Sequence, residues 1–150
     1  MTFTENFEKA KWVIITFGTS WVYRHIEKDI IVSNCHKHPA KEFRREFLSI
    51  EEIVNLYTPL IAANPEKRWI FTVSPIRHIK DGLHENQLSK ATLLLAIDSL
   101  CKKFDNCSYF PSYEIVLDEM RDYSHFAEDS VHPSEETILK VYEKFKKFAL

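Results

Sequence analysis

A carboxylate stands three residues before a histidine in the segment from Asp129 to Ser134, just ahead of the last stretch with a helical pattern. Imidazole titrates near neutral pH and can accept a proton, and a neighbouring carboxylate can hold its ring in place. Asp129 and His132 are therefore the strongest candidates for acid–base chemistry in the chain. The alternative is that Asp129 only caps the helix, which Pro133 could open from its first position, while His132 packs beside the proline.

Two further polar clusters follow apolar runs that are typical of buried strands. Gly18-Thr19-Ser20 comes after residues 12–17, and Ser74-Pro75-Ile76-Arg77-His78 comes after residues 68–73. Ligand sites in open α/β sheets lie beyond the carboxyl ends of the strands, so these clusters and the Asp129–His132 pair should converge. Arg77 could bind a carboxylate or phosphate there, or it could form an ordinary surface ion pair.

The order of elements predicts an α/β fold with a mainly parallel sheet. Strands are expected at 12–17, 68–73 and 107–110, and a hairpin over 21–33. Helices are expected after a capping box formed by Ser49 and Glu52, over 88–104, from Ser112 through Asp118, and along an apolar stripe over 138–148. Residues 41–47 alternate basic side chains with phenylalanines, and we interpret them as a charged helix face rather than a nucleic-acid patch.

The composition indicates one domain over residues 1–150. A formal net charge of −2 gives no general attraction to nucleic acid or to a membrane surface, and no apolar run reaches the roughly 20 residues that span a bilayer. The polar start lacks the features of a signal peptide, so we expect a cytoplasmic chain with reduced cysteines.

Cofactor and metal sites receive little support from the residue types. Two glycines are too few for a phosphate-binding loop, so no nucleotide cofactor is expected. The run Asn34-Cys35-His36-Lys37-His38 could join His78 or His84 at a zinc ion, but short His-x-His runs are usually incidental. We expect neither a cofactor nor a metal.

Longer motifs, in this order, resemble the GSCFA family, a branch of the SGNH or GDSL-like hydrolases. The resemblance covers nearly the whole chain and rests on residues 15–25, 34–37, 39–43, 72–78, 81–82, 86–87, 89–92, 109–115, 118–119, 121–123 and 129–134. It implies a three-layer α/β/α sandwich of the SGNH type. The Gly-Ser-Cys-Phe-Ala motif that names the family, and whose serine would be the nucleophile, does not occur here. We therefore expect a sheet that is incomplete at its amino-terminal end.

The resemblance also implies roles for individual residues. His132 would be the general base that takes the serine proton, and Asp129 would hold its ring. Gly18, Ser20 and Asn34 would lie on the oxyanion side of the site. The substrate-binding residues would be Arg77 and His78.

Ser20 has a second interpretation. It follows a strand that ends in Phe-Gly-Thr, which has the outline of a nucleophile block, so its hydroxyl could itself attack the substrate. The family register instead places Ser20 at an oxyanion-side or structural position, and we favour that interpretation.

Complete relatives of this kind look like serine esterases or acyl hydrolases acting on small-molecule or glycan esters. Without the nucleophile, we expect the isolated chain to be inactive. The alternative is a non-catalytic binding module, or a split subunit that supplies His132 and Asp129 to another chain. A missing opening strand would also leave a sheet edge unpaired, which favours self-association through that edge.

Overall fold

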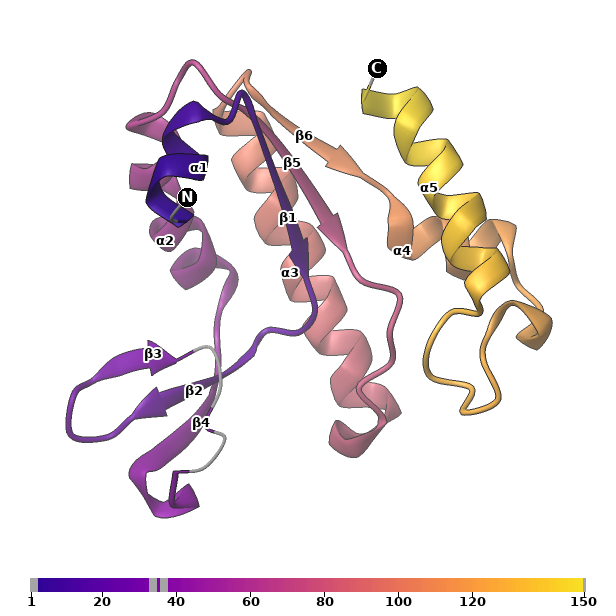
Figure 1. Ribbon diagram of the computed structural model, residues 1–150. Coiled ribbons are helices and arrows are strands. Elements are labelled where there is room, and N and C mark those ends of the chain that lie inside the picture. Colours follow the sequence, from indigo (N-terminus) through magenta and orange to yellow (C-terminus); the bar gives the residue numbers. More distant parts are fainter. Residues whose placement is uncertain (1–2, 33–34, 36–37, 150) are drawn as a thin grey trace.

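The computed structural model describes residues 3–32, 35 and 38–149 of the chain. Within these residues, the main sheet has three parallel strands, β1 (Trp12–Phe17), β5 (Arg68–Val73) and β6 (Cys107–Phe110), in the order β1-β5-β6 (Figure 1). These strands confirm the sequence predictions for 12–17, 68–73 and 107–110. Each run is short, largely apolar and followed by a turn residue, as is typical of a buried strand. The register pairs Phe17 with Val73 and Thr72 with Phe110, so the carboxyl ends of the strands lie together.

Helices cover both faces of this sheet, which confirms the α/β class (Figure 1). The longer helices are α1 (Phe3–Lys9), α2 (Ile50–Ala62), α3 (Leu83–Lys103) and α5 (Glu135–Ala149). Alternate residues of β5 point to opposite faces: Trp69 and Phe71 pack into the core formed with α2 and α3, whereas Ile70 packs with Phe110 and with side chains of α5. The short helical elements are η1 (Ala40–Glu42), η2 (Ile79–Asp81), α4 (Ser112–Glu114), η3 (Ile115–Glu119) and η4 (Tyr123–His125).

A small antiparallel sheet leaves the main sheet after β1. Its strands β2 (Trp21–His25), β3 (Ile30–Val32) and β4 (Phe43–Phe47) lie in the order β3-β2-β4. The predicted hairpin is confirmed, with Asp29 at a positive φ of 50° in its turn.

The prediction of a charged helix face at 41–47 is wrong, because most of that segment is β4. Arg24 and Arg44 face each other across the strands, and Glu46 bonds to both, with 2.9 Å to Arg24 Nε and 2.6 Å to Arg44 Nε. Trp21 and Phe47 pack edge to face on the same strand pair. The two-residue period of the strand therefore puts Arg44 and Glu46 on one face, and Phe43 and Phe47 on the other face together with Arg45, which lies over Trp21.

Helix ends differ from the sequence predictions in three places. The capping box at Ser49 and Glu52 is confirmed, but α3 begins at Leu83, five residues before the predicted start, because its first turn is polar and carries no apolar period. Ser112 is not a cap: Pro111 precedes α4 as its N-cap, and the Ser112 hydroxyl donates to the Val73 carbonyl at 2.7 Å.

The last helix, α5, begins at Glu135 rather than at Pro133. Ser134 precedes it, and its hydroxyl accepts a hydrogen bond from the Thr137 backbone at 3.3 Å. A side-chain oxygen at this position satisfies one of the free N–H groups in the first turn. Pro133 instead forms a β-bridge with Phe126, which leaves the Asp129–His132 segment as a closed loop in front of the helix.

Both edges of the main sheet lack a paired strand in the described part of the chain, and the β1 edge also exposes apolar side chains. β1 pairs with β5 alone, and its outward face exposes Trp12 and Ile14, of which Ile14 is 53% exposed. α5 lies over β5 and β6 and leaves this strip of β1 uncovered (Figure 1). Among the helices described, none is long and apolar enough to cross a membrane.

Candidate active site

The structure brings Asp129 and His132 into direct contact. His132 Nδ1 lies 2.6 Å from Asp129 Oδ2, and Asp129 Oδ1 accepts hydrogen bonds from the backbone N–H groups of His132 at 3.0 Å and Val131 at 2.9 Å. These bonds, led by that from the His132 backbone and followed by that from its ring, lower the pKa of the Asp129 carboxyl to about 2. Asp129 is thus an ionised acceptor, so Nδ1 is the ring nitrogen that donates to it and Nε2 is the nitrogen that the carboxylate leaves open.

Backbone hydrogen bonds close the loop that carries this pair. Ala127 N–H donates to the His132 carbonyl at 2.8 Å, Ser130 N–H donates to the Ala127 carbonyl at 2.9 Å, and Ser134 N–H donates to the His125 carbonyl at 2.9 Å. Ser130 takes a positive φ of 55° between the two partners. The Asp129–His132 pair, called the dyad below, therefore lies on a tight loop and not on the helix itself. Hydrogen bonds join the two ends of this loop.

Arg77 fastens this loop to the end of β5. Its backbone N–H donates to the Val131 carbonyl at 3.4 Å, and its Nη1 donates to the Ser130 carbonyl at 3.3 Å. The guanidinium lies 4.3 Å from the centre of the Phe126 ring, within the range of a cation–π contact. Among the described residues no carboxylate forms an ion pair with Arg77, so the surface ion pair considered from the sequence is absent there.

A groove of about 510 Å³ opens in front of the dyad. One wall comes from the antiparallel sheet and the other from the segment after β5 and from the dyad loop. Arg45 lies 4.2 Å over the Trp21 ring and forms an ion pair of 2.5 Å with Asp81, which joins the two walls at one end. The lining residues are Thr19, Trp21, Tyr23, Arg45, Ile76, Arg77, His78, Ile79, Lys80, Asp81, Asp129, Val131 and His132.

Ser20 does not face this groove. It is 1% exposed, its backbone N–H donates to Ser89 Oγ at 2.7 Å, and its hydroxyl donates to the Ser89 carbonyl at 2.9 Å. Both polar groups of Ser20 are therefore bound to α3, which supports a structural role for it and weighs against the nucleophile alternative. Of its two companions in the prediction, Gly18 lies at the end of β1 beside His78, and Asn34 lies outside the described residues.

His78 lines the groove but also packs inward. Its backbone N–H donates to Asn86 Oδ1 at 2.9 Å, and its ring Nε2 is buried without a hydrogen-bond partner among the residues described. Burial, and next to it the charge of Lys90, lower the pKa of the His78 imidazole. Burial therefore favours the neutral form of the ring.

Lys90 is a polar residue of this region that the sequence reasoning missed. It is 1% exposed, and its ammonium donates to the Gly18 and Ser74 carbonyls, each at 2.6 Å. Burial lowers the pKa of Lys90 to about 8. The spacing of Asn86, Ser89 and Lys90 could have revealed it, because positions i, i+3 and i+4 share one face of a helix.

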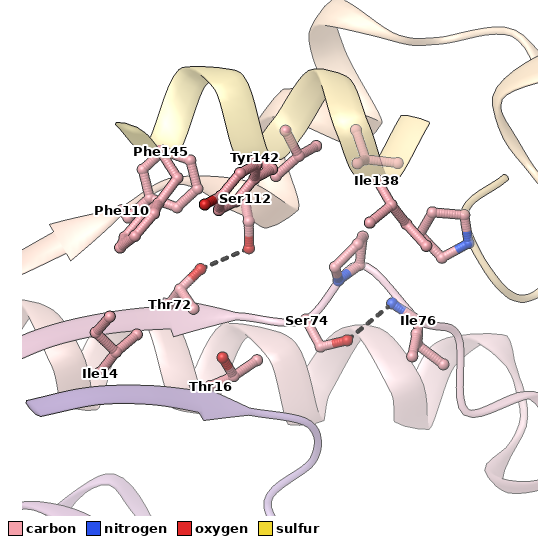
Figure 2. A pocket seen from close by; sticks show the side chains of 14 residues that line it. Ile14, Thr16, Thr72, Ser74, Ile76, Phe110, Ser112, Ile138, Tyr142 and Phe145 are labelled. Atoms are coloured by element: carbon pink, nitrogen blue, oxygen red, sulfur yellow. Dashed lines mark hydrogen bonds between the residues drawn. The ribbon is translucent and has the colours of Figure 1, made fainter. Parts of the chain in front are cut away.

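A second cavity, of about 380 Å³, lies between the sheet and α5. Figure 2 shows Ile14 and Thr16 of β1 on one side of it and Ile138, Tyr142 and Phe145 of α5 on the other. Most of its lining is apolar, and Thr72 and Ser112, 2.5 Å apart, bond to each other on its floor. Ile76 borders both this cavity and the groove, so the two are neighbours.

The described residues contain no group of three His, Cys, Asp or Glu side chains arranged to hold a metal ion. His36, which belongs to the weak zinc candidate of the sequence, lies outside them. Cys101 and Cys107 are half-buried, and burial raises the pKa of both thiols, that of Cys107 to about 12.

Comparison with known proteins identifies the class. A model of the GSCFA family matches residues 1–145, and the chain belongs to this family. No curated protein matches the chain, and no solved structure matches it.

Proposed function

We propose that this chain carries the acid–base half of an SGNH-type serine esterase or acyl hydrolase. The observation that supports this most directly is the 2.6 Å contact between Asp129 and His132 at the border of a groove. That groove lies beyond the carboxyl ends of parallel strands, where open α/β sheets place their ligand sites. Arg77 and His78 line the same groove as the dyad, which is consistent with the proposal that they contact the substrate.

The proposed reaction is acyl transfer through a serine hydroxyl. His132 Nε2 takes the hydroxyl proton as the serine oxygen attacks the ester carbonyl, and the proton then passes to the departing alkoxide. Water attacks the acyl-serine in the second half, with His132 again taking and returning a proton. Asp129, ionised throughout, stabilises the charged ring between these steps.

The serine must come from another segment. In the described chain no hydroxyl group lies within hydrogen-bonding distance of His132 Nε2, and Ser20 is bound to α3. A parallel strand paired with the free edge of β1 would bring its carboxyl end to the same end of the sheet as Gly18. The isolated chain is therefore inactive, and a small-molecule or glycan ester is the substrate once the site is complete.

A non-catalytic role is the second candidate, and the uncovered strip of β1 favours it. An unpaired strand edge with exposed Trp12 and Ile14 is suited to binding another polypeptide or a second copy of the chain. In that case the chain acts as a binding module or as the split subunit that brings His132 and Asp129 to a partner.

Ester hydrolysis tests the proposal. Purified chain is assayed with p-nitrophenyl acetate, alone and after mixing with a polypeptide that contains a Gly-Ser-Cys-Phe-Ala strand segment. We expect background rates alone, since loss of the nucleophile costs on the order of 10⁶ in turnover. The mixture should gain activity that His132→Ala abolishes and the control His84→Ala leaves intact. Activity of the chain alone that Ser20→Ala removes would overturn the proposal.

A further inference from the structure

One face of α3 holds the ends of both strands that border the groove. Asn86 accepts from the His78 backbone, Ser89 binds Ser20, and Lys90 donates to the Gly18 and Ser74 carbonyls. Lys90 differs from the other two because it brings a charge into the interior. Within the described chain no carboxylate forms an ion pair with it. Removing the charged ammonium from water costs a large desolvation free energy. Its hydrogen bonds to the backbone carbonyls provide the main compensation.

The bond from Lys90 fixes the direction of one peptide group. The Gly18–Thr19 peptide bond is trans, and in a planar trans peptide the C=O and the N–H point in opposite directions. Because the Gly18 carbonyl points at Lys90 Nζ, 2.6 Å away, the Thr19 N–H points away from α3. Thr19 lines the groove, its hydroxyl bonds to Ser89, and its N–H has no acceptor among the residues that the structure describes.

The same bond also strengthens that N–H as a donor. A charged donor on the carbonyl oxygen polarises the peptide group, and hydrogen bonds in such a chain reinforce one another where the dielectric is low. Ser20, the next residue, offers no such group because its N–H is already bound to Ser89. Of these two neighbouring amides, only the one at Thr19 is free to meet a ligand.

We propose that the Thr19 N–H is an oxyanion donor of the groove and that Lys90 is the positioning residue that aims and polarises it. The inference rests on the proposed function, since an ester hydrolase needs a donor where negative charge develops on the carbonyl oxygen. It reassigns the oxyanion contact from Ser20 to the backbone of the preceding residue.

Anion binding by the chain alone tests this. Acetate is titrated into ¹⁵N-labelled protein, its carboxylate standing for the oxyanion, and amide shifts are followed by NMR. We expect a saturable shift of the Thr19 amide in the wild type. Lys90→Met should bind acetate at least about tenfold more weakly, as loss of a charge-assisted hydrogen bond implies.

Lys102→Met is the matched control, because it removes one positive charge from an exposed position on the same helix, and it should bind acetate as the wild type does. If Lys90→Met does not fold, Lys90→Gln, which removes the charge and keeps an N–H donor, should show the same weakening. An unmoved Thr19 amide in the wild type, or equal affinity in the folded Lys90 variant, would overturn the inference. Neither result bears on the serine or on turnover, so the hydrolase proposal is judged separately.

Discussion

Lys90 should make the chain more stable as the solution becomes alkaline. Its pKa falls from 10.5 to about 8 on folding, because the charged ammonium loses its hydration. Between these values the folded chain has released the Lys90 proton while the unfolded chain still holds it. Unfolding then takes up a proton, so the free energy of unfolding rises with pH. The contribution is absent below pH about 8 and complete above about 10.5.

The expected size follows from the shift. A difference between 10.5 and about 8 corresponds to a total of about 3 kcal/mol, of which about 2 kcal/mol should be present by pH about 9.5. Other groups act in the opposite direction over the same range. Burial raises the pKa of Cys101, Cys107 and Tyr113, so their contribution is lost as pH rises. The Lys90 effect must therefore be measured as a difference.

Urea unfolding of the wild type and of Lys90→Met, at a series of pH values from neutral to about 9.5, supplies that difference. The gap between their unfolding free energies should move in favour of the wild type by about 2 kcal/mol across the series. Lys102→Met, at an exposed position on α3, should keep a constant gap. A constant gap for Lys90→Met as well would refute the reasoning, because it would mean that Lys90 is charged equally in both states.

Three further outcomes are expected. Arg77→Met should speed amide hydrogen exchange in residues 126–133 by about tenfold, as loss of a contact worth about 1.4 kcal/mol predicts, and unchanged exchange would show that Arg77 does not hold the loop. The Asp129 carboxyl should titrate with a pKa of about 2 by ¹³C NMR, and a pKa of 3.8 would contradict the observed bonds. Its contribution to stability is therefore present above pH 3.8 and lost as the pH falls through about 2. Size-exclusion with light scattering should find dimers or larger species that Ile14→Lys dissociates, and a monomeric wild type would show that the β1 edge needs no partner.

The main sheet could be predicted from the sequence because its strands carry a strong local signal. Residues 12–17, 68–73 and 107–110 are short apolar runs with clear ends, and all of them are strands. The segment 41–47 could not be assigned in the same way. Its charges suit a helix surface as well as a strand, and only pairing with β2, which places Glu46 between Arg24 and Arg44, decides between the two.

The candidate site was predictable in part for a related reason. The contact between Asp129 and His132 is local, so spacing in the sequence was enough to suggest it. The bonds of Ser20 to Ser89 and of Lys90 to Gly18 join residues far apart in the chain. No periodicity within a single segment reports such contacts, and a serine after a strand looks alike whether it faces a groove or a helix.

The antiparallel sheet leaves and rejoins the rest of the fold at nearly one point. The Ser20 carbonyl accepts from the Leu48 backbone at 2.9 Å, and Ser20 itself is anchored to α3. The stretch between them, which carries Trp21, Tyr23 and Arg45 into the groove, is thus a loop excursion whose ends are already fixed. Such excursions tolerate replacement as long as the side chain that reaches the core, here Val22, is kept. On the proposed function, exchange of this stretch between family members should change ligand preference and leave the Asp129–His132 contact intact.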